Sequence, residues 1–193
     1  MHALMETTLQ LDDAVAAYHD GDLVTAARLF EALAEAGCVE AQAWIGALHA
    51  NGEGVPADPE RGLRWLRTAA EAGDAMAQSN LATLYFKGQG TAQDEAQAAH
   101  WYRQAAGQGH FPSQARLGFM YANGLGVDKD RAQAFAWLSL AAQHGVGSAL
   151  NALEGMIGQM SAEEKQKGAA LFDQWRSRTA AVSSPARLIP VPG

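Results

Sequence analysis

The sequence is poor in several residue types, and each shortage argues against a class of protein. It has one cysteine, Cys38, so no internal disulfide can form, which fits a reducing compartment. No apolar run approaches the roughly 20 residues that a membrane-spanning helix needs, so we expect no direct membrane insertion. The 14 basic residues are outnumbered by 21 acidic ones. The resulting net charge of -7 argues against nucleic acid as a partner.

Residues arranged for catalysis are also missing. The six histidines are scattered, without the i, i+4 pairing or the companion cysteines of a zinc site. Neither Ser113 nor Ser148 lies in the G-x-S-x-G context of a nucleophile. Segments such as Gly88-Gln-Gly90 superficially resemble a phosphate cradle, but they follow a predicted helix instead of a strand. We therefore predict no catalytic residue, no metal and no cofactor.

What the sequence does contain is a repeat with a period of 36 residues. The stretch from Ala77 to Gly109 has a nearly matching copy on either side, Ala41 to Gly73 and Ser113 to Gly145. The positions in register are Trp65, Trp101 and Trp137; Gly73, Gly109 and Gly145; and the pairs Gly52/Gly54, Gly88/Gly90 and Gly124/Gly126. Self-similarity at this period indicates a stacked helical array. The three tryptophans share a helical face with an Ala-Ala pair, so we predict that they are core residues.

Each copy predicts two antiparallel helices. Apolar residues three and four apart, such as Leu81 and Leu84, indicate a first helix that ends at Gly88, where a left-handed cap is expected. One small residue per first helix, Gly46, Ala82 or Gly118, lets a neighbouring helix approach closely. The acids Asp58, Asp94 and Asp130 suit the start of the second helix. A single pair is too small to bury its apolar faces, so the copies must stack.

These residues resemble the Sel-1-like repeat, a relative of the tetratricopeptide repeat. The slots of the middle copy are filled by Ala77, Leu81, Tyr85, Gly88, Gly90, Asp94, Ala98, Trp101, Tyr102, Ala105, Ala106 and Gly109. Departures are local: His49 in the tyrosine slot, Ala82 in the glycine slot, Thr91 in the valine slot, and Leu66 and Leu138 in the second aromatic slot. The resemblance implies an all-α fold, an α/α superhelix or right-handed solenoid of antiparallel helix pairs.

The period also predicts the organisation of the protein. We expect an N-terminal extension (1–7), a capping helix pair (8–37), a repeat region (38–145, divided as 41–76, 77–112 and 113–148), closing helices (148–178) and a flexible tail (179–193). Ser161 to Glu164 is a capping box before the last helix. We expect Ala169, Leu171, Phe172 and Trp175 to cover the exposed end of the stack. In the tail, Arg187-Leu-Ile-Pro-Val is either a partner-binding peptide or part of a plain terminus.

The opening pair carries nearly all of the net charge. Residues 1–36 hold seven acidic side chains and one basic side chain. Terminal repeats need a polar outer face for solubility, so a solvated cap explains this charge. Electrostatic docking of a basic partner is the alternative.

By analogy with the related repeat, the first helices line a concave wall that grips a peptide or helix. The predicted partner-binding residues are Ala43, Trp44, Ala47, Asn80, Thr83, Phe86, Arg116 and Phe119. Exposed aromatic and arginine side chains are types that anchor interfaces. The competing interpretation is that Phe86 and Phe119 fill packing gaps between helices.

The resemblance implies a non-enzymatic adaptor that holds a protein partner in a larger complex. One alternative is an accessory subunit of a membrane-associated complex, docking through its tail or convex face. Another is a cell-wall or β-lactam enzyme, as implied by cysteine-rich relatives, but the equivalent positions here hold Ala, Trp or Gly. The start MHALMETTLQ lacks a basic region followed by an apolar core, so we expect a cytoplasmic protein, or a periplasmic one if the true start differs.

Overall fold

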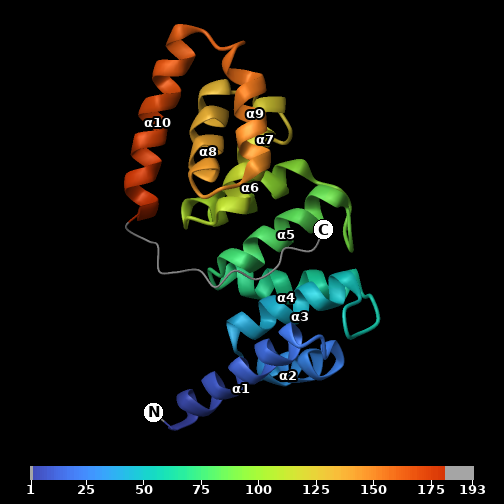
Figure 1. Ribbon diagram of the computed structural model, residues 1–193. Coiled ribbons are helices and arrows are strands. Elements are labelled where there is room, and N and C mark those ends of the chain that lie inside the picture. The colour runs from blue at the N-terminus through green and yellow to red at the C-terminus, as the bar shows by residue number, and fades with distance from the viewer. Residues whose placement is uncertain (1, 181–193) are drawn as a thin grey trace. The chain divides into compact units, whose positions relative to one another are not determined.

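The computed structural model describes residues 2–180, and every secondary-structure element of this part is an α-helix (Figure 1). The helices are α1 (His2–His19), α2 (Leu23–Glu35), α3 (Val39–Asn51), α4 (Pro59–Glu71), α5 (Ala75–Lys87), α6 (Glu95–Gly107), α7 (Phe111–Asn123), α8 (Arg131–Gln143), α9 (Gly147–Ile157) and α10 (Ala162–Ala180). This confirms the all-α prediction. No helix within the described residues is long and apolar enough to cross a membrane.

The predicted turn chemistry is confirmed. Gly52, Gly88 and Gly124 end α3, α5 and α7 in the left-handed conformation, with φ of 74°, 69° and 75°. The side chains of Asp58, Asp94 and Asp130 accept hydrogen bonds from backbone N–H groups in the first turns of α4, α6 and α8. Each repeat is therefore closed at the same two points by a glycine and an aspartate.

The second glycine of each turn has a role that the sequence did not reveal. A Cβ at Gly54 would lie 2.0 Å from the carbonyl oxygen of Leu23, the first residue of α2. The equivalent Cβ at Gly126 would lie 2.1 Å from the carbonyl oxygen of Glu95, the first residue of α6. Real Cβ atoms do not approach backbone this closely, so each turn rests directly on the start of the preceding second helix. Only glycine permits that contact.

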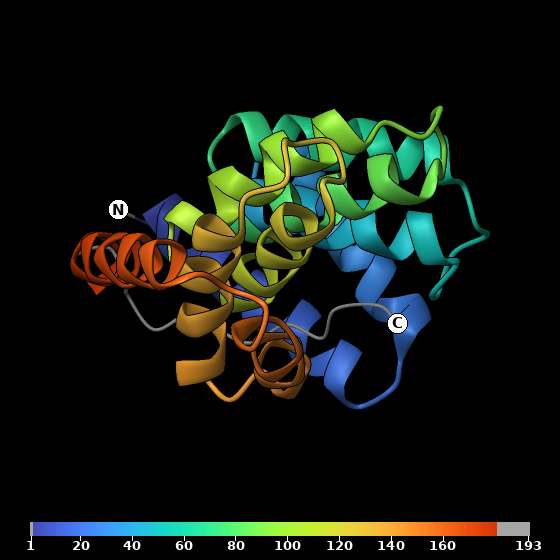
Figure 2. The ribbon, with the colours of Figure 1, turned by 90° about the horizontal axis from the view of Figure 1, so that it is seen from above.

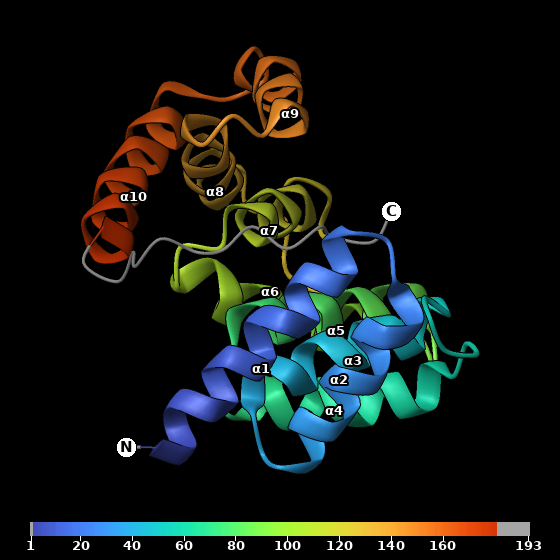
Figure 3. The same cartoon turned by 60° about the horizontal axis from the view of Figure 1, so that its bottom comes forward.

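The protein divides into two compact units, with the boundary between Gln93 and Asp94. In the first unit, α1 packs on α2, α2 on α3, α3 on α4 and α4 on α5, and α3 also contacts α5. Figure 3 shows this succession, with α1 and α2 lying beside α3. The first unit is thus a regular stack that ends in a first helix, α5.

In the second unit, α6 packs on α7, α7 on α8 and α8 on α9, and α9 also contacts α7 as the next first helix should. The last helix breaks the pattern, because α10 packs along α8 and reaches α6. Figures 1 and 3 show α8 between α9 and α10, and Figure 2 gives the view from above. Aromatic packing fixes α10, since the ring centroids of Trp175 and Trp137 lie 4.4 Å apart.

Several sequence predictions need correction. Helix α10 does not cover the end of the stack, because α9 lies there instead; Leu171, Phe172 and Trp175 are half-buried and Ala169 is exposed. Thr179, predicted to begin the flexible tail, is a buried residue of α10. Helix α1 begins at His2, within the segment that the sequence analysis named only as an extension. Of the three tryptophans predicted as core, Trp137 is buried, whereas Trp65 and Trp101 are only half-buried. The predicted tail peptide, Arg187-Leu-Ile-Pro-Val, lies outside the described residues.

Candidate protein-binding surface

The predicted partner-binding residues fall into three groups in the structure. In the first unit Ala43 and Trp44 are buried, with 0% and 2% of their surface exposed. Asn80 is 9% exposed, while Ala47, Thr83 and Phe86 are half-buried. In the second unit Arg116 and Phe119 are exposed, and Phe119 keeps 47% of its surface in solvent. The eight residues therefore differ in what they can offer to a partner.

Trp44 belongs to the core of the first unit instead of its surface. Its ring stacks on Phe30 of α2, with centroids 4.9 Å apart and an interplanar angle of 9°, and lies equally close to Tyr18 of α1. The opening helix pair covers this side of α3, so Trp44 and Ala43 have no surface left for a partner. Repeat position alone could not reveal that cover.

A small hollow lies between the first helices α3 and α5. It is lined by Ala47, Ala50, Asn51, Leu66, Asn80, Thr83, Leu84, Lys87 and Gln89, and its volume is about 20 Å³. Three of the predicted residues, Ala47, Asn80 and Thr83, therefore meet at one place. A volume of this size holds a water molecule or one small polar group, and it is far smaller than the pockets that hold organic ligands.

The polar groups of the hollow differ in how they are satisfied. The Thr83 hydroxyl donates to the Ser79 carbonyl oxygen at 3.0 Å, and Asn51 Nδ2 donates to Glu53 Oε1 at 3.1 Å. By contrast, Asn80, a residue that is 9% exposed, forms no hydrogen bond with another described residue, and its amide is not among the fully buried side-chain groups. Lys87 is exposed and forms no ion pair with any described residue. The hollow thus combines an amide that bonds to no other described residue with a cation that forms no ion pair among the described residues.

The second unit presents a different surface. Arg116 and Phe119 lie three residues apart on α7, hence on one face of that helix. Asn123 Nδ2 donates to the Phe119 carbonyl oxygen at 2.8 Å and so ties the end of the same face. The exposure of Phe119 argues against the interpretation that this ring fills a packing gap. Phe86 is half-buried, which leaves both interpretations open for that residue.

Polar contacts between neighbouring helix pairs recur at a fixed separation of 18 residues. Arg67 Nη2 donates to Tyr85 Oη at 2.8 Å, and Arg103 Nη2 donates to Tyr121 Oη at 2.9 Å. At the first junction the residues are Glu31 and His49, with His49 Nε2 3.8 Å from Glu31 Oε1. The sequence showed His49 in the tyrosine slot but not that Glu31, which is paired with Arg61, lies opposite it. The constant separation of 18 residues between the Arg67 and Tyr85 positions of the repeat could have predicted that Glu31 lies opposite His49.

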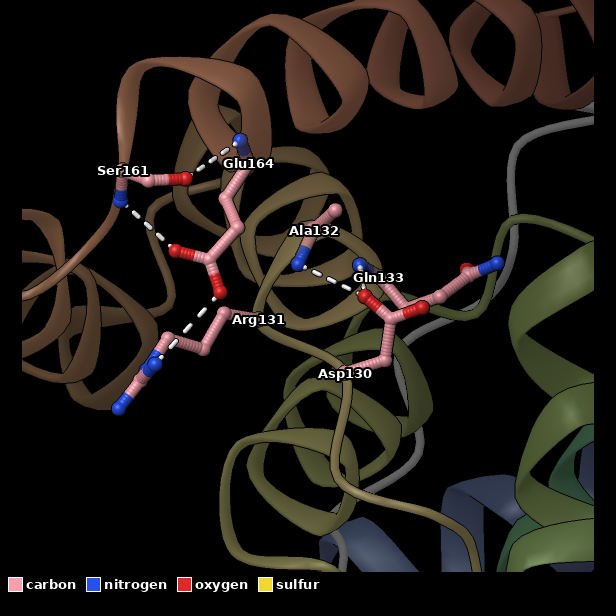
Figure 4. Close-up of polar contacts among 6 residues, drawn as sticks. All are labelled: Asp130, Arg131, Ala132, Gln133, Ser161 and Glu164. Atoms are coloured by element: carbon pink, nitrogen blue, oxygen red, sulfur yellow. Dashed lines mark hydrogen bonds and ion pairs between the residues drawn. The ribbon is translucent and has the colours of Figure 1, made fainter.

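Another charged cluster joins the starts of α8 and α10 (Figure 4). Glu164 accepts from Ser161 N at 2.7 Å and lies 3.5 Å from Arg131, while Lys167 Nζ donates to Asp130 at 3.3 Å. The backbone hydrogen bond from Ser161 is the main reason that the pKa of Glu164 falls below its usual value. Each of these charges has a partner, so the cluster helps to hold α10 against the start of α8.

The residue just before a first helix is its N-cap, and two of these N-cap side chains have shifted pKa values. His110 caps α7, with Nδ1 2.8 Å from Ser113 Oγ, and burial lowers its pKa to about 4. Asp74 caps α5 and accepts from Ala77 N at 2.6 Å, yet burial raises its pKa above the usual value. Both shifts have the same cause, because burial disfavours the charged form of either side chain. No group of three metal-ligating side chains is found within residues 2–180.

The comparisons with known proteins agree with this architecture. The family model described as Sel1 repeat matches residues 39–74, 75–110 and 112–146. No curated protein matches the sequence.

Among solved structures, the protein is similar to c5321, a protective antigen present in uropathogenic Escherichia coli strains with an SLR fold, at 29% identity and a TM-score of 0.74. That match covers 87% of this chain but only 38% of the antigen.

A Sel1 repeat protein from Oxalobacter formigenes is similar at 26% identity and a TM-score of 0.69, over 95% of this chain and 76% of that one. The cysteine-rich protein B of Helicobacter pylori shares the fold at 22% identity and a TM-score of 0.51, over 74% of this chain and 96% of that one. Because the three matched segments cover more than half of the sequence and coincide with the helix pairs described above, the protein belongs to the Sel1 repeat family.

Proposed function

We propose that the protein is a non-enzymatic adaptor that binds a protein segment on the exposed faces of its first helices. The observation that carries this proposal is the pair Arg116 and Phe119 on α7. Phe119 keeps 47% of its surface in solvent, and the exposed Arg116 lies about one helical turn away on the same face of α7. Aromatic and arginine side chains supply much of the binding energy in protein interfaces.

The first unit supports the same proposal in another way. Its hollow between α3 and α5 brings Ala47, Asn80 and Thr83 together on first helices. Two of the lining side chains, Ala47 and Ala50, are small, so a partner segment can approach the backbone of α3 there. Trp44 and Ala43, which are buried, have no part in the proposed surface.

Site-specific photo-crosslinking tests the proposal. A photoreactive amino acid is placed at Phe119 or Thr83 of the full-length protein, expressed in the native host, and crosslinked partners are identified by mass spectrometry. The control position is Gln104, which is exposed on the second helix α6. We expect a protein partner to crosslink at position 119 and at position 83, no crosslink at 104, and loss of the crosslink at position 119 when Arg116 is changed to Ala.

Two outcomes would contradict the proposal in favour of another binding mode. Equal crosslinking at Gln104 would show that the first-helix faces are not selective. Loss of the partner on removal of residues 181–193, with Phe119→Ala harmless, would instead favour an accessory subunit that docks through its tail. A third outcome, turnover of a cell-wall or β-lactam substrate by the purified protein above a denatured control, would favour an enzyme.

A further inference from the structure

The hollow between α3 and α5 has a chemistry that points to a specific ligand group. We propose that it binds a carboxylate of an acidic protein segment, with Asn80 and Lys87 as the ligating side chains. This inference rests on the proposed adaptor function and names the chemical class of the segment that the first unit takes. It depends on three features: the unpartnered amide, the unpaired cation and the size of the hollow.

Asn80 supplies the first feature. An amide offers two N–H donors and a carbonyl acceptor. Asn80 is nine-tenths buried, lines the hollow and bonds to no other described residue. Two other polar groups beside it are already engaged, because Thr83 donates to Ser79 and Asn51 donates to Glu53. An incoming acceptor would satisfy the Asn80 N–H groups.

Lys87 supplies the second feature. Among the described residues it is the only charged side chain that lines the hollow, so no carboxylate of this part of the protein faces it there. The first unit, residues 1–93, carries 13 acidic and 5 basic side chains, so potential partners for a lysine are abundant in the sequence. Lys87 nevertheless has none among the described residues. A cation left unpaired beside the Asn80 amide favours an anionic acceptor from outside.

The size and the surroundings define which anion fits. A hollow of about 20 Å³ admits one small polar group and excludes a ring. The acidic charge of the unit repels a polyanion such as nucleic acid at long range, whereas a single carboxylate can still bind at contact distance. Carboxylates of this kind come from Asp or Glu side chains or from the C-terminal residue of a protein.

The test uses peptides as probes of the full-length protein labelled with ¹⁵N. The first probe is an N-acetylated, C-amidated peptide of sequence GEGEG. The second is GQGQG with the same blocked ends, and the third is acetylated pentaglycine with a free C-terminal carboxylate. The readout is the shift of the Asn80 side-chain amide resonances as peptide is added, at concentrations up to about ten times a millimolar Kd.

We expect GEGEG to shift the Asn80 amide and GQGQG to leave it unmoved. Lys87→Gln should weaken the apparent Kd for GEGEG by about tenfold, and added salt should weaken it further. Lys87 is exposed, so this variant should fold normally, and Lys165→Gln on the exposed side of α10 is the matched control with no expected effect. A response to pentaglycine alone would assign the site to C-termini, and a response to GEGEG alone to acidic side chains.

The proposal is overturned if neither carboxylate peptide moves the Asn80 resonances, if GQGQG moves them equally, or if Lys87→Gln binds as tightly as the native protein. These failures leave the adaptor function intact, because that function is judged by crosslinking at Phe119 and Thr83. Conversely, absence of selective crosslinks alongside a positive peptide titration would reject the adaptor while retaining the carboxylate site.

Discussion

One position of the repeat differs between the helix pairs α3–α4 and α7–α8 and the C-terminal helix α9. It is a buried glycine in the two pairs and an exposed glutamate in α9. In α3 and α7 that position is Gly46 or Gly118, where an added Cβ would lie 2.7 Å from a leucine Cγ of the second helix. In α9 the position is Glu154, which is exposed, and no second helix of the described residues closes onto it. A single residue at the point of closest helix approach thus distinguishes a closed pair from an open end.

The consequence is visible on both sides of α9. Its inner residues Leu153 and Met156 join the core with α8, as their repeat equivalents do. On the opposite side Leu150 and Ile157 remain 51% and 38% exposed, because α10 packs along α8 instead. The outer face of α9 is therefore left without a second helix among the described residues.

The largest expected effect comes from transferring the end residue into the interior. Gly118→Glu would force a charged side chain against Leu138, and we expect a loss of about 3 kcal/mol or more in the free energy of unfolding. Chemical denaturation measures this loss. The reciprocal change, Glu154→Gly, should lower stability by only about 1 kcal/mol, the helix propensity difference. Similar losses of unfolding free energy for Gly118→Glu and Glu154→Gly would contradict the view that this position is tightly packed in α7 and open in α9.

Removing the aromatic contact of α10 should have the next largest effect. Trp175→Ala deletes the ring packed 4.4 Å from Trp137, and because Trp175 is half-buried we expect a loss of about 2 kcal/mol. Amide hydrogen exchange should then rise along α10 while α9 is unchanged. The exposed neighbour Gln174→Ala is the control. Equal exchange in α9 and α10 of the Trp175 variant would show that the two helices form a pair after all.

The His110 cap should make the second unit sensitive to acid. The folded pKa is about 4, below the usual 6.5, so the unfolded protein binds a proton first as pH falls. Stability from this residue is complete above about pH 6.5 and is lost progressively toward pH 4, by about 1–3 kcal/mol. His110→Asn keeps a capping side chain but cannot titrate. Unfolding midpoints at pH 7.5 and 4.5 should therefore differ less in the variant, and an unchanged difference would contradict the assignment.

The capping box of α10 should have a smaller effect. Ser161 Oγ accepts from Glu164 N at 3.1 Å, while Glu164 accepts from Ser161 N. Ser161→Ala should cost about 1 kcal/mol. Ser177→Ala in the same helix removes only a local hydroxyl contact to Asp173 and should be nearly neutral. Thermal unfolding of the two variants makes the comparison, and matched melting temperatures would argue against the capping box.

The smallest effect should be a gain. Gly155 lies inside α9 with no atom within 4 Å of an added Cβ, so Gly155→Ala should stabilise by about 0.5–1 kcal/mol. The same substitution at Gly126, where the Cβ would meet the Glu95 carbonyl at 2.1 Å, must destabilise. If the two variants, Gly155→Ala and Gly126→Ala, shift the melting temperature in the same direction, the prediction that Gly155 has free space around it is wrong.

Features set by local chemistry were predictable from the sequence. The left-handed Gly88, the Asp94 cap and the box from Ser161 to Glu164 each depend on residues close together in the sequence. Features that depend on distant packing were not predictable. Trp44 occupies a rim position in the repeat pattern, but the opening pair covers it in the folded unit.

The candidate site shows the same division. The small and polar first-helix residues Ala47, Asn80 and Thr83 were found from repeat position, because that position defines a face of each helix. Lys87 and Asn51 were missed, since they lie at the helix ends and join the hollow only through the packing of α3 against α5. Whether an amide is left without a partner depends on three-dimensional contacts, which a single sequence does not contain.

Buried glutamines bond three of the first helices, α3, α5 and α7, to the helix before each of them. The side-chain amides of Gln42, Gln78 and Gln114 donate to carbonyl oxygens of Ala34, Ala70 and Ala106, eight residues earlier, at 3.2–3.3 Å. In α9 the same position is Leu150, which has no amide to donate. Under a pulling force, α9 lacks the glutamine hydrogen bond that resists separation of α3, α5 and α7 from the helices before them. Mechanical failure should therefore start at the C-terminal end and travel toward the N-terminus.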